Sequence, residues 1–174
     1  GMDGRLGEMS YKKTEQEKKA SVFLDMFYES LNGIIIQDAP LRSFDYWDKL
    51  VRFENITYKI EEKSFTSLWD TLLIEIIEDL KTGDLGWFYQ TRADKIIYSF
   101  YENEDSTEPK YIYSLSTDKM RKYVLDNIKE LISKAKLSTK GYGTTLFVNI
   151  PLDIGERVYP KVVKGTAGSD TKSV

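Results

Sequence analysis

The stretch YWDKLVRFENITYKIEEK, residues 46–63, decides the fold that we expect for this chain. Apolar and polar residues alternate on both sides of Glu54 and Asn55, which predicts two antiparallel strands joined by a two-residue turn. Phe53 then lies opposite Ile56, and each step away from the turn pairs the next residue of one strand with the next residue of the other. The register of the hairpin is therefore predicted from the sequence alone.

This register divides the hairpin into two faces, because successive side chains of a strand point to opposite sides. One face is largely apolar and contains the opposed pairs Phe53 and Ile56, Val51 and Tyr58, and Lys49 and Ile60. The other face contains the pairs Arg52 and Thr57, Leu50 and Lys59, Asp48 and Glu61, and Tyr46 and Lys63. Directly opposed Cβ atoms lie about 4.5–5.5 Å apart, so Asp48 and Glu61 are expected to be neighbours, with Lys63 beside them.

Two adjacent carboxylates and a lysine are suited to the metal-dependent hydrolysis of phosphodiesters. The carboxylates repel each other unless a cation lies between them, and Mg2+ or Mn2+ is the cation that oxygen ligands prefer. Such a metal polarises a phosphate and lowers the pKa of a bound water, while a lysine stabilises charge or positions that water. The alternative interpretation is that Asp48, Glu61 and Lys63 form the solvated face of an amphipathic hairpin, in which the lysine offsets the two acids.

The composition excludes several other kinds of chemistry. The 174 residues contain no His and no Cys, which removes Cys or His zinc sites, a Ser-His-Asp triad, a cysteine nucleophile and any disulfide. Aromatic residues make up 13% of the chain, which indicates a folded protein. The net charge of −3 weakly opposes a nucleic-acid partner but does not exclude one, because carboxylates around a cation lower the total while a local face stays basic.

The remaining pattern predicts one α/β domain over residues 14–158, with a mixed sheet flanked by helices. Thr14 and Glu17 form a capping box at the start of the first helix, and Asn32 and Gly33 end it. The further expected elements are strands at residues 46–53, 56–63, 72–77, 95–101, 110–115 and 144–150, and a long helix after Ser116 that precedes the last strand.

The ends of the chain carry no pattern of secondary structure. Residues 1–13 and 160–174 are expected to be flexible termini. No apolar run approaches the length of a membrane span, and no export signal precedes the first helix. We therefore expect a cytoplasmic protein that does not bind a membrane.

Asp48 followed by Glu61-Glu62-Lys63 resembles the D…(D/E)-x-K signature of the PD-(D/E)XK nuclease superfamily, which has the restriction-endonuclease-like fold. In that superfamily the Asp and the (D/E)-x-K motif lie on adjacent antiparallel strands, as predicted here for Asp48 and Glu61. The proline that precedes the first Asp in the superfamily is replaced here by Trp47.

The resemblance extends beyond this signature. Residues 70–76 and 86–94, followed by an apolar strand with Tyr98, resemble small phage and prophage proteins of the same fold. The combined resemblance covers about residues 15–115.

The resemblance implies a nuclease that depends on Mg2+ or Mn2+. Asp48 and Glu61 would ligate the metal, the backbone carbonyl of Glu62 would add a ligand, and Lys63 would activate or orient the attacking water. Many members also place an acid on the first helix near the metal.

Two acids of the first helix are candidates for that position, Glu17 first and Asp25 second. DNA is the expected partner in preference to RNA, and a homodimer would provide one site for each strand of a duplex. Two other functions remain open. The same fold would also serve as a non-catalytic module that binds nucleic acid or a protein, or as a structural phage accessory protein.

Residues 86–94 allow two interpretations. They would form a rim facing DNA, with Arg92 on a phosphate. Alternatively, Trp87 and Tyr89 are packing residues and Asp94 caps a turn, which is the interpretation that we favour because strand and turn aromatics usually pack.

Overall fold

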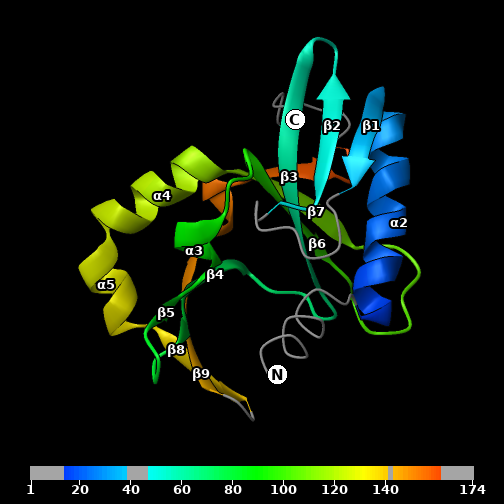
Figure 1. Ribbon diagram of the computed structural model, residues 1–174. Helices are drawn as coiled ribbons and strands as arrows, with labels where there is room; N and C mark the ends of the chain where they lie inside the picture. Colours follow the sequence, from blue (N-terminus) through cyan, green and yellow to red (C-terminus); the bar gives the residue numbers. More distant parts are fainter. Residues whose placement is uncertain (1–13, 39–46, 141–142, 162–174) are drawn as a thin grey trace, which may run out of the picture.

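The computed structural model describes residues 14–38, 47–140 and 143–161 (Figure 1). In chain order the elements are α2 (Glu15–Ser30), β1 (Gly33–Asp38), β2 (Lys49–Phe53), β3 (Ile56–Phe65), β4 (Thr71–Asp79), β5 (Asp84–Leu85), α3 (Trp87–Gln90), β6 (Lys95–Phe100), β7 (Tyr111–Ser116), α4 (Thr117–Asp126), α5 (Ile128–Ser133), β8 (Lys136–Lys140), β9 (Gly143–Pro151), the 3-10 turn η1 (Leu152–Ile154) and β10 (Glu156–Tyr159). Within these ranges no helix combines the length and the apolar character needed to cross a membrane.

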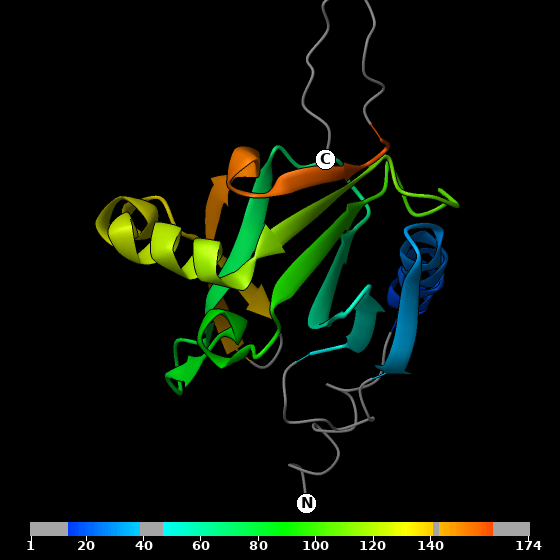
Figure 2. The same cartoon turned by 90° about the horizontal axis from the view of Figure 1, so that it is seen from above.

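The strands form two sheets, where the sequence predicted one mixed sheet. The larger sheet has the order β1-β2-β3-β6-β7-β10, and the smaller has the order β5-β4-β9-β8. β3 and β6 pair in parallel, whereas β2 pairs antiparallel with both β1 and β3. Figure 2 shows α2 against one side of the larger sheet, with α4, α5 and the smaller sheet on the other side. The predicted α/β class with a mixed sheet and flanking helices is therefore confirmed.

From Lys49 to Phe53 the β2–β3 hairpin has the predicted register, but Asp48, predicted opposite Glu61, instead donates its backbone N–H to the carbonyl of Ile60. Phe53 lies opposite Ile56, and Lys49 lies opposite Ile60. Glu54 has a φ of 55°, in the left-handed region that tight hairpin turns use. β2 begins at Lys49 rather than at residue 46, so Asp48 lies just before the strand, and Tyr46 falls outside the described residues.

The first helix begins and ends as predicted. Thr14 Oγ1 accepts from the backbone N–H of Glu17 at 3.1 Å, and Glu17 Oε1 accepts from the backbone N–H of Thr14 at 3.0 Å. Asn32 has a φ of 65° and turns the chain directly into β1. A Cβ on Gly33 would lie 2.6 Å from the ring of Phe53, so the close contact between β1 and β2 at this point requires glycine.

The larger sheet packs against α2 on one side and, through the end of β3, β6 and β7, against the smaller sheet and α4 on the other. Between α2 and the sheet, the buried apolar residues are Leu24, Tyr28, Val51, Ile60, Ile97 and Ile112. On the other side, the sheet packs against the smaller sheet and α4 through residues that include Leu72, Ile74, Tyr98, Leu115, Val124 and Val148. The charged groups at residues 61–63 of β3 are therefore close to an apolar core, whereas Lys59 is exposed.

Several elements differ from the prediction. The single long helix expected after Ser116 is divided into α4 and α5 at Asn127, whose side-chain amide donates to the carbonyl of Tyr123 at 2.9 Å. A side chain that competes for a backbone carbonyl in this way ends a helix. The sequence also did not predict the strands β1, β5, β8 and β10 or the short helix α3, which are short or lie at sheet edges. Of the expected flexible termini at residues 1–13 and 160–174, residues 1–13 and 162–174 lie outside the described residues.

Candidate functional site

Two groups of polar side chains lie on opposite faces of β3. We define the Lys63 cluster, which lies on the side of the smaller sheet, as Glu61, Lys63, Glu75, Trp87 and Thr91. We define the Lys49 cluster, which lies on the side of α2, as Ser21, Asp25, Tyr28, Lys49 and Glu62. The two groups exist because β3 alternates, so that Glu61 and Lys63 point to one side and Glu62 points to the other.

In the Lys63 cluster, Glu61 is held from two directions. Lys63 Nζ lies 3.0 Å from Glu61 Oε2, and the hydroxyl of Thr91 donates to Glu61 Oε1 at 2.8 Å. Lys63 Nζ also lies 5.0 Å from the centre of the Trp87 ring, a cation–π contact. The side chains of Glu61 and Lys63 are only 12% and 28% exposed. Glu61 and Lys63 are therefore largely covered and do not form the solvated face that the alternative interpretation described, although the lysine does offset Glu61 as that interpretation expected.

Contacts outside β3 fix the segment at residues 86–91, which borders this cluster. A Cβ on Gly86 would overlap the backbone carbonyl of Glu75, so only glycine allows this close approach. The approach lets the backbone N–H of Trp87 donate to Glu75 Oε2 at 3.1 Å. From α4, Arg121 Nη2 donates to the carbonyl of Thr91 at 2.7 Å. The turn that presents Trp87 and Thr91 is thus fixed from both sides.

Residues 86–94 largely follow the packing interpretation. Trp87 is half-buried and packs against the core, whereas Tyr89 is 47% exposed. The carboxylate of Asp94 accepts from the backbone N–H of Lys59 at 2.8 Å. The sequence had suggested that Asp94 caps a turn. In the structure Asp94 instead connects this segment to β3. Arg92 is exposed, and its role as a phosphate contact stays a prediction.

The electrostatics of the Lys63 cluster keep the lysine charged. Burial lowers the pKa of Lys63, but the negative charges of Glu61, Asp48 and Glu75 outweigh burial, and the net effect raises that pKa above its usual range. The raised pKa favours the charged form of Lys63, which is then a cation and hydrogen-bond donor.

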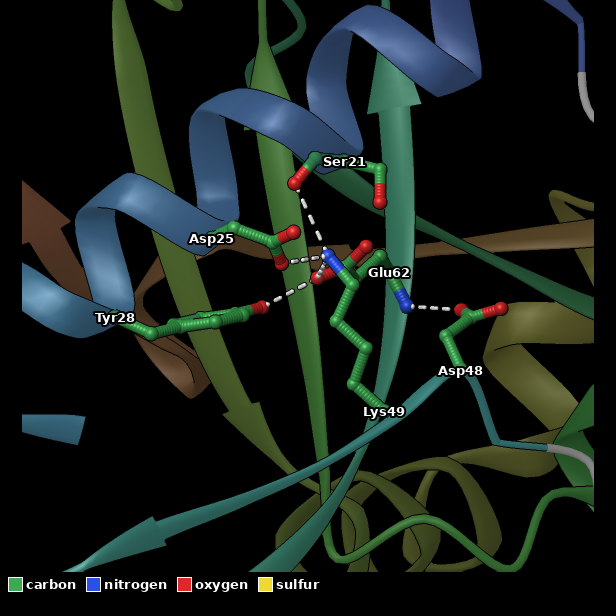
Figure 3. Close-up of polar contacts among 6 residues, drawn as sticks. All are labelled: Ser21, Asp25, Tyr28, Asp48, Lys49 and Glu62. Atoms are coloured by element: carbon green, nitrogen blue, oxygen red, sulfur yellow. Dashed lines mark hydrogen bonds and ion pairs between the residues drawn. The ribbon is translucent and has the colours of Figure 1, made fainter. Parts of the chain in front are cut away.

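The Lys49 cluster surrounds a lysine that is 1% exposed (Figure 3). Lys49 Nζ lies 2.5 Å from Asp25 Oδ1 and 3.0 Å from Glu62 Oε2, and it donates to the carbonyl of Ser21 at 3.0 Å. The hydroxyl of Tyr28 donates to Glu62 Oε2 at 2.7 Å. Each charge in this buried group therefore has an opposite charge or a donor, as burial of ions requires.

Burial sets the protonation of this second cluster. Burial raises the pKa of Glu62 to about 7, although Lys49 acts in the opposite direction. Burial lowers the pKa of Lys49, but attraction by Glu62 and the hydrogen bond to Asp25 outweigh it, so the net effect raises that pKa. Burial, and then the negative charge of Glu62, raise the pKa of Tyr28 well above its usual range.

Asp48 connects the two clusters. Its Oδ2 accepts from the backbone N–H of Glu62 at 2.6 Å, and its own backbone N–H donates to the carbonyl of Ile60 at 2.7 Å. Its negative charge raises the pKa of both Lys63 and Glu62. Asp48 also lines a cavity of about 30 Å³ between α2 and the sheet, together with Glu17, Ser21, Glu62, Ser64 and Ser99.

The two acids of the first helix that the sequence proposed near a metal, Glu17 and Asp25, make different contacts. Glu17 belongs to the capping box and borders the small cavity beside Asp48. Asp25, the second choice, forms an ion pair with Lys49. Glu17 is thus the helix acid that lines one cavity with Asp48, and its role near a metal stays a prediction.

No protein-family model matches this sequence. No curated protein matches it either. Function is therefore inferred from the geometry of these residues and from the resemblance of the hairpin motif.

The donor set suits a hard divalent cation. Among the residues that the structure describes, no group of three or more acidic side chains is arranged to hold a metal ion. Mg2+, however, is commonly bound by one or two carboxylates and completed by waters and substrate phosphates. Asp48 and Glu61, with the backbone carbonyl of Glu62, could provide oxygen ligands of this kind.

Several residues of these clusters were missed by sequence reasoning. Thr91 and Arg121 come from distant segments, and no local pattern marks them. Two signals were available: Lys49 is a charge on the apolar face of the hairpin, and Glu75 interrupts an otherwise apolar run. A charge inside an apolar pattern indicates a buried ion pair or a site.

Proposed function

We propose that this protein is a Mg2+-dependent nuclease that hydrolyses phosphodiester bonds of DNA, built on a restriction-endonuclease-like core. The observation that carries the proposal is the hairpin contact that brings Asp48 beside residues 61–63. Lys49 lies opposite Ile60, and Asp48, just before β2, accepts from the backbone N–H of Glu62 at 2.6 Å. Lys63 then contacts Glu61 from the same strand.

The surrounding fold supports the proposal. The superfamily that the sequence resembles places its Asp and its (D/E)-x-K motif on adjacent antiparallel strands. Here β2 and β3 are adjacent and antiparallel. The helix α2 comes before them, and the buried strand β6 pairs with β3 on its other side.

Each residue has a distinct role in the proposed reaction. Asp48, Glu61 and the backbone carbonyl of Glu62 would hold the metal, which supplies charge at the phosphate and lowers the pKa of water when bound. Lys63, charged at neutral pH, orients the attacking water or stabilises negative charge that develops on the phosphate. Thr91 holds one oxygen of Glu61 in a fixed position, so that little reorganisation accompanies the reaction.

One observation favours the second candidate, a non-catalytic module that binds nucleic acid or a protein. Lys63 and Thr91 already engage both carboxylate oxygens of Glu61. The charge of Glu61 is therefore balanced without a metal. In this case the Lys63 cluster would serve stability and not catalysis.

Metal binding separates the two candidates. Calorimetric titration with Mg2+ and Mn2+ would compare the unaltered protein with Asp48→Asn, which keeps an oxygen for the N–H of Glu62. Glu130→Gln is the matched control, because Glu130 is an exposed acid on α5, 68% exposed and distant from the hairpin. Each titration would be repeated with a short DNA duplex and a single strand, because substrate phosphates complete many Mg2+ sites.

Metal binding that is lost in Asp48→Asn and kept in Glu130→Gln is the result that we expect. Cleavage of the same DNA, dependent on the metal, should follow. If millimolar metal does not bind even in the presence of DNA, the nuclease proposal is wrong and the non-catalytic module is favoured.

A further inference from the structure

The face of β1, β2 and β3 that points away from α2 leads directly to the Lys63 cluster. Opposed residues define two rows across the three strands, Ile34–Arg52–Thr57 and Gln37–Leu50–Lys59. The next residue of β3 on this face is Glu61, and the one after it is Lys63. Consecutive rows are about 7 Å apart, because two residues of a strand span that length. In Figure 1 this part of the sheet, with the hairpin tip, projects beyond the rest of the fold.

The alternation of β2 assigns these side chains to the open face. Val51 is fully buried against α2 together with Leu24 and Tyr28, so its neighbours Leu50 and Arg52 point to the opposite side. Five of the six row residues are exposed, and Leu50 is half-buried. We call these six residues the open face.

The charge of the open face is opposite to that of the whole chain. Arg52 and Lys59 are its charged residues, and the rows contain no acid, although the chain has a net charge of −3. Beyond the rows, the charge of Glu61 is paired with Lys63, and the carboxylate of Asp94 binds the backbone N–H of Lys59. A local positive face of this kind complements phosphate.

The apolar residues of the open face distinguish the kinds of DNA that it would suit. Ile34 is 53% exposed and lies directly opposite Arg52. Leu50 lies opposite Lys59. A duplex presents its phosphates to such a surface and keeps its bases stacked inside, whereas a single strand offers both phosphates and apolar base faces. Alternating cationic and apolar side chains therefore fit a single strand better.

We infer that the open face binds single-stranded DNA and guides it along β3 toward the Lys63 cluster. Phosphates contact Arg52 and Lys59, and bases contact Ile34 and Leu50. This inference rests on the proposed function and names the form of its substrate.

The test measures binding of a fluorescently labelled oligothymidylate of about 20 nucleotides by anisotropy over a range of salt concentrations. For single strands, each phosphate contact contributes about 0.7 to the slope of log K against log salt. The double variant Arg52→Gln/Lys59→Gln should therefore reduce the slope by about 1.4 and weaken binding about tenfold or more at 0.1 M salt. Each single variant should reduce the slope by about half as much as the double variant, about 0.7.

A second double variant provides the matched control. Lys122→Gln/Lys134→Gln removes the same charge from α4 and from the end of α5, where the two side chains are 79% and 75% exposed. Its slope and affinity should stay close to those of the unaltered protein. Thermal unfolding of both double variants should also match, because all four positions are exposed.

The inference is overturned if the unaltered protein does not bind the single strand, if it binds a duplex of the same length more tightly, or if the two double variants weaken binding equally. Metal calorimetry on Arg52→Gln/Lys59→Gln keeps this result separate from the nuclease proposal. If metal binds but the open-face variant binds DNA normally, the inference fails and the nuclease stands. If binding depends on Arg52 and Lys59 but no metal binds, the inference stands and the nuclease fails.

Discussion

Thr91 donates a hydrogen bond to Glu61 at 2.8 Å although 30 residues separate the two in the sequence. Thr91 is 2% exposed, and its own carbonyl is held by Arg121 from α4. The position of the Glu61 carboxylate therefore depends on three segments of the chain. It is this contact, together with Lys63, that makes Glu61 a fixed group and not a mobile surface acid.

Thr91→Val should destabilise the fold by about 1–3 kcal/mol, because it keeps the shape of the side chain but leaves a Glu61 carboxylate oxygen without its donor and the backbone N–H of Ala93 without its acceptor. Urea unfolding would measure the change in the free energy of unfolding. The control is Thr57→Val, at an exposed position on β3, the strand that contains Glu61. It should change that free energy by less than about 0.5 kcal/mol. Equal effects of the two variants would show that the Thr91–Glu61 bond does not contribute.

Lys49→Met should destabilise the fold by about 3–5 kcal/mol, because it leaves the buried Glu62 and the partly exposed Asp25 without their cation. The double variant Lys49→Met/Glu62→Gln should recover part of this loss, since it removes the buried negative charge as well. Unfolding in urea would measure all three proteins. Lys122→Met, at an exposed helix pair, should change stability by less than about 1 kcal/mol.

The stability of the protein should fall between about pH 4.5 and pH 7 through Glu62. Burial raises the pKa of Glu62 from its ordinary 4.5 to about 7, so the folded state binds more protons than the unfolded state in this window. Stability then decreases as pH rises, by roughly 3 kcal/mol at about 1.4 kcal/mol per pH unit.

Glu62→Gln should remove this dependence, which free energies of unfolding measured across the window without divalent metal would detect. Glu130→Gln, an exposed acid, should retain it. Parallel curves for the unaltered protein and Glu62→Gln would contradict the assignment.

Lys63→Met should reduce the proposed DNA cleavage at least about a hundredfold, because it removes a fixed cation from the site of developing charge. Metal binding in calorimetry should persist, since the ligands are the acids and not the lysine. Lys122→Met again serves as the control for loss of a charge at the surface. Cleavage that Lys63→Met leaves unchanged would exclude the proposed role of Lys63 even if the protein is a nuclease.

Local interactions explain what could be predicted. The register of β2 and β3 follows from a two-residue turn and alternation, and both involve residues that are close in sequence. The capping box between Thr14 and Glu17 is local in the same way. The proximity of Lys63 to Glu61 needed only the spacing of two residues along one strand.

Contacts between distant segments explain the features that the sequence did not predict. The division of the strands into two sheets depends on the pairing of β4 with β9, which are about 75 residues apart. Likewise Lys49, placed on an apolar face by its position in the strand, has its charge neutralised by Asp25 of α2. Neither partner can be found from alternation, because a pattern states which side a residue faces and not what lies there.

The sequence by itself determined which residues share a face of the hairpin, because backbone geometry couples side-chain direction to position along a strand. Only the tertiary structure decided which of those faces is solvated. The smaller sheet and the turn at residues 86–91 cover Glu61 and Lys63, while Arg52 and Lys59 on the same face stay exposed. Burial depends on which segments lie next to a residue. It fixes Glu61 and Lys63 in place, while Arg52 and Lys59 stay accessible to solvent.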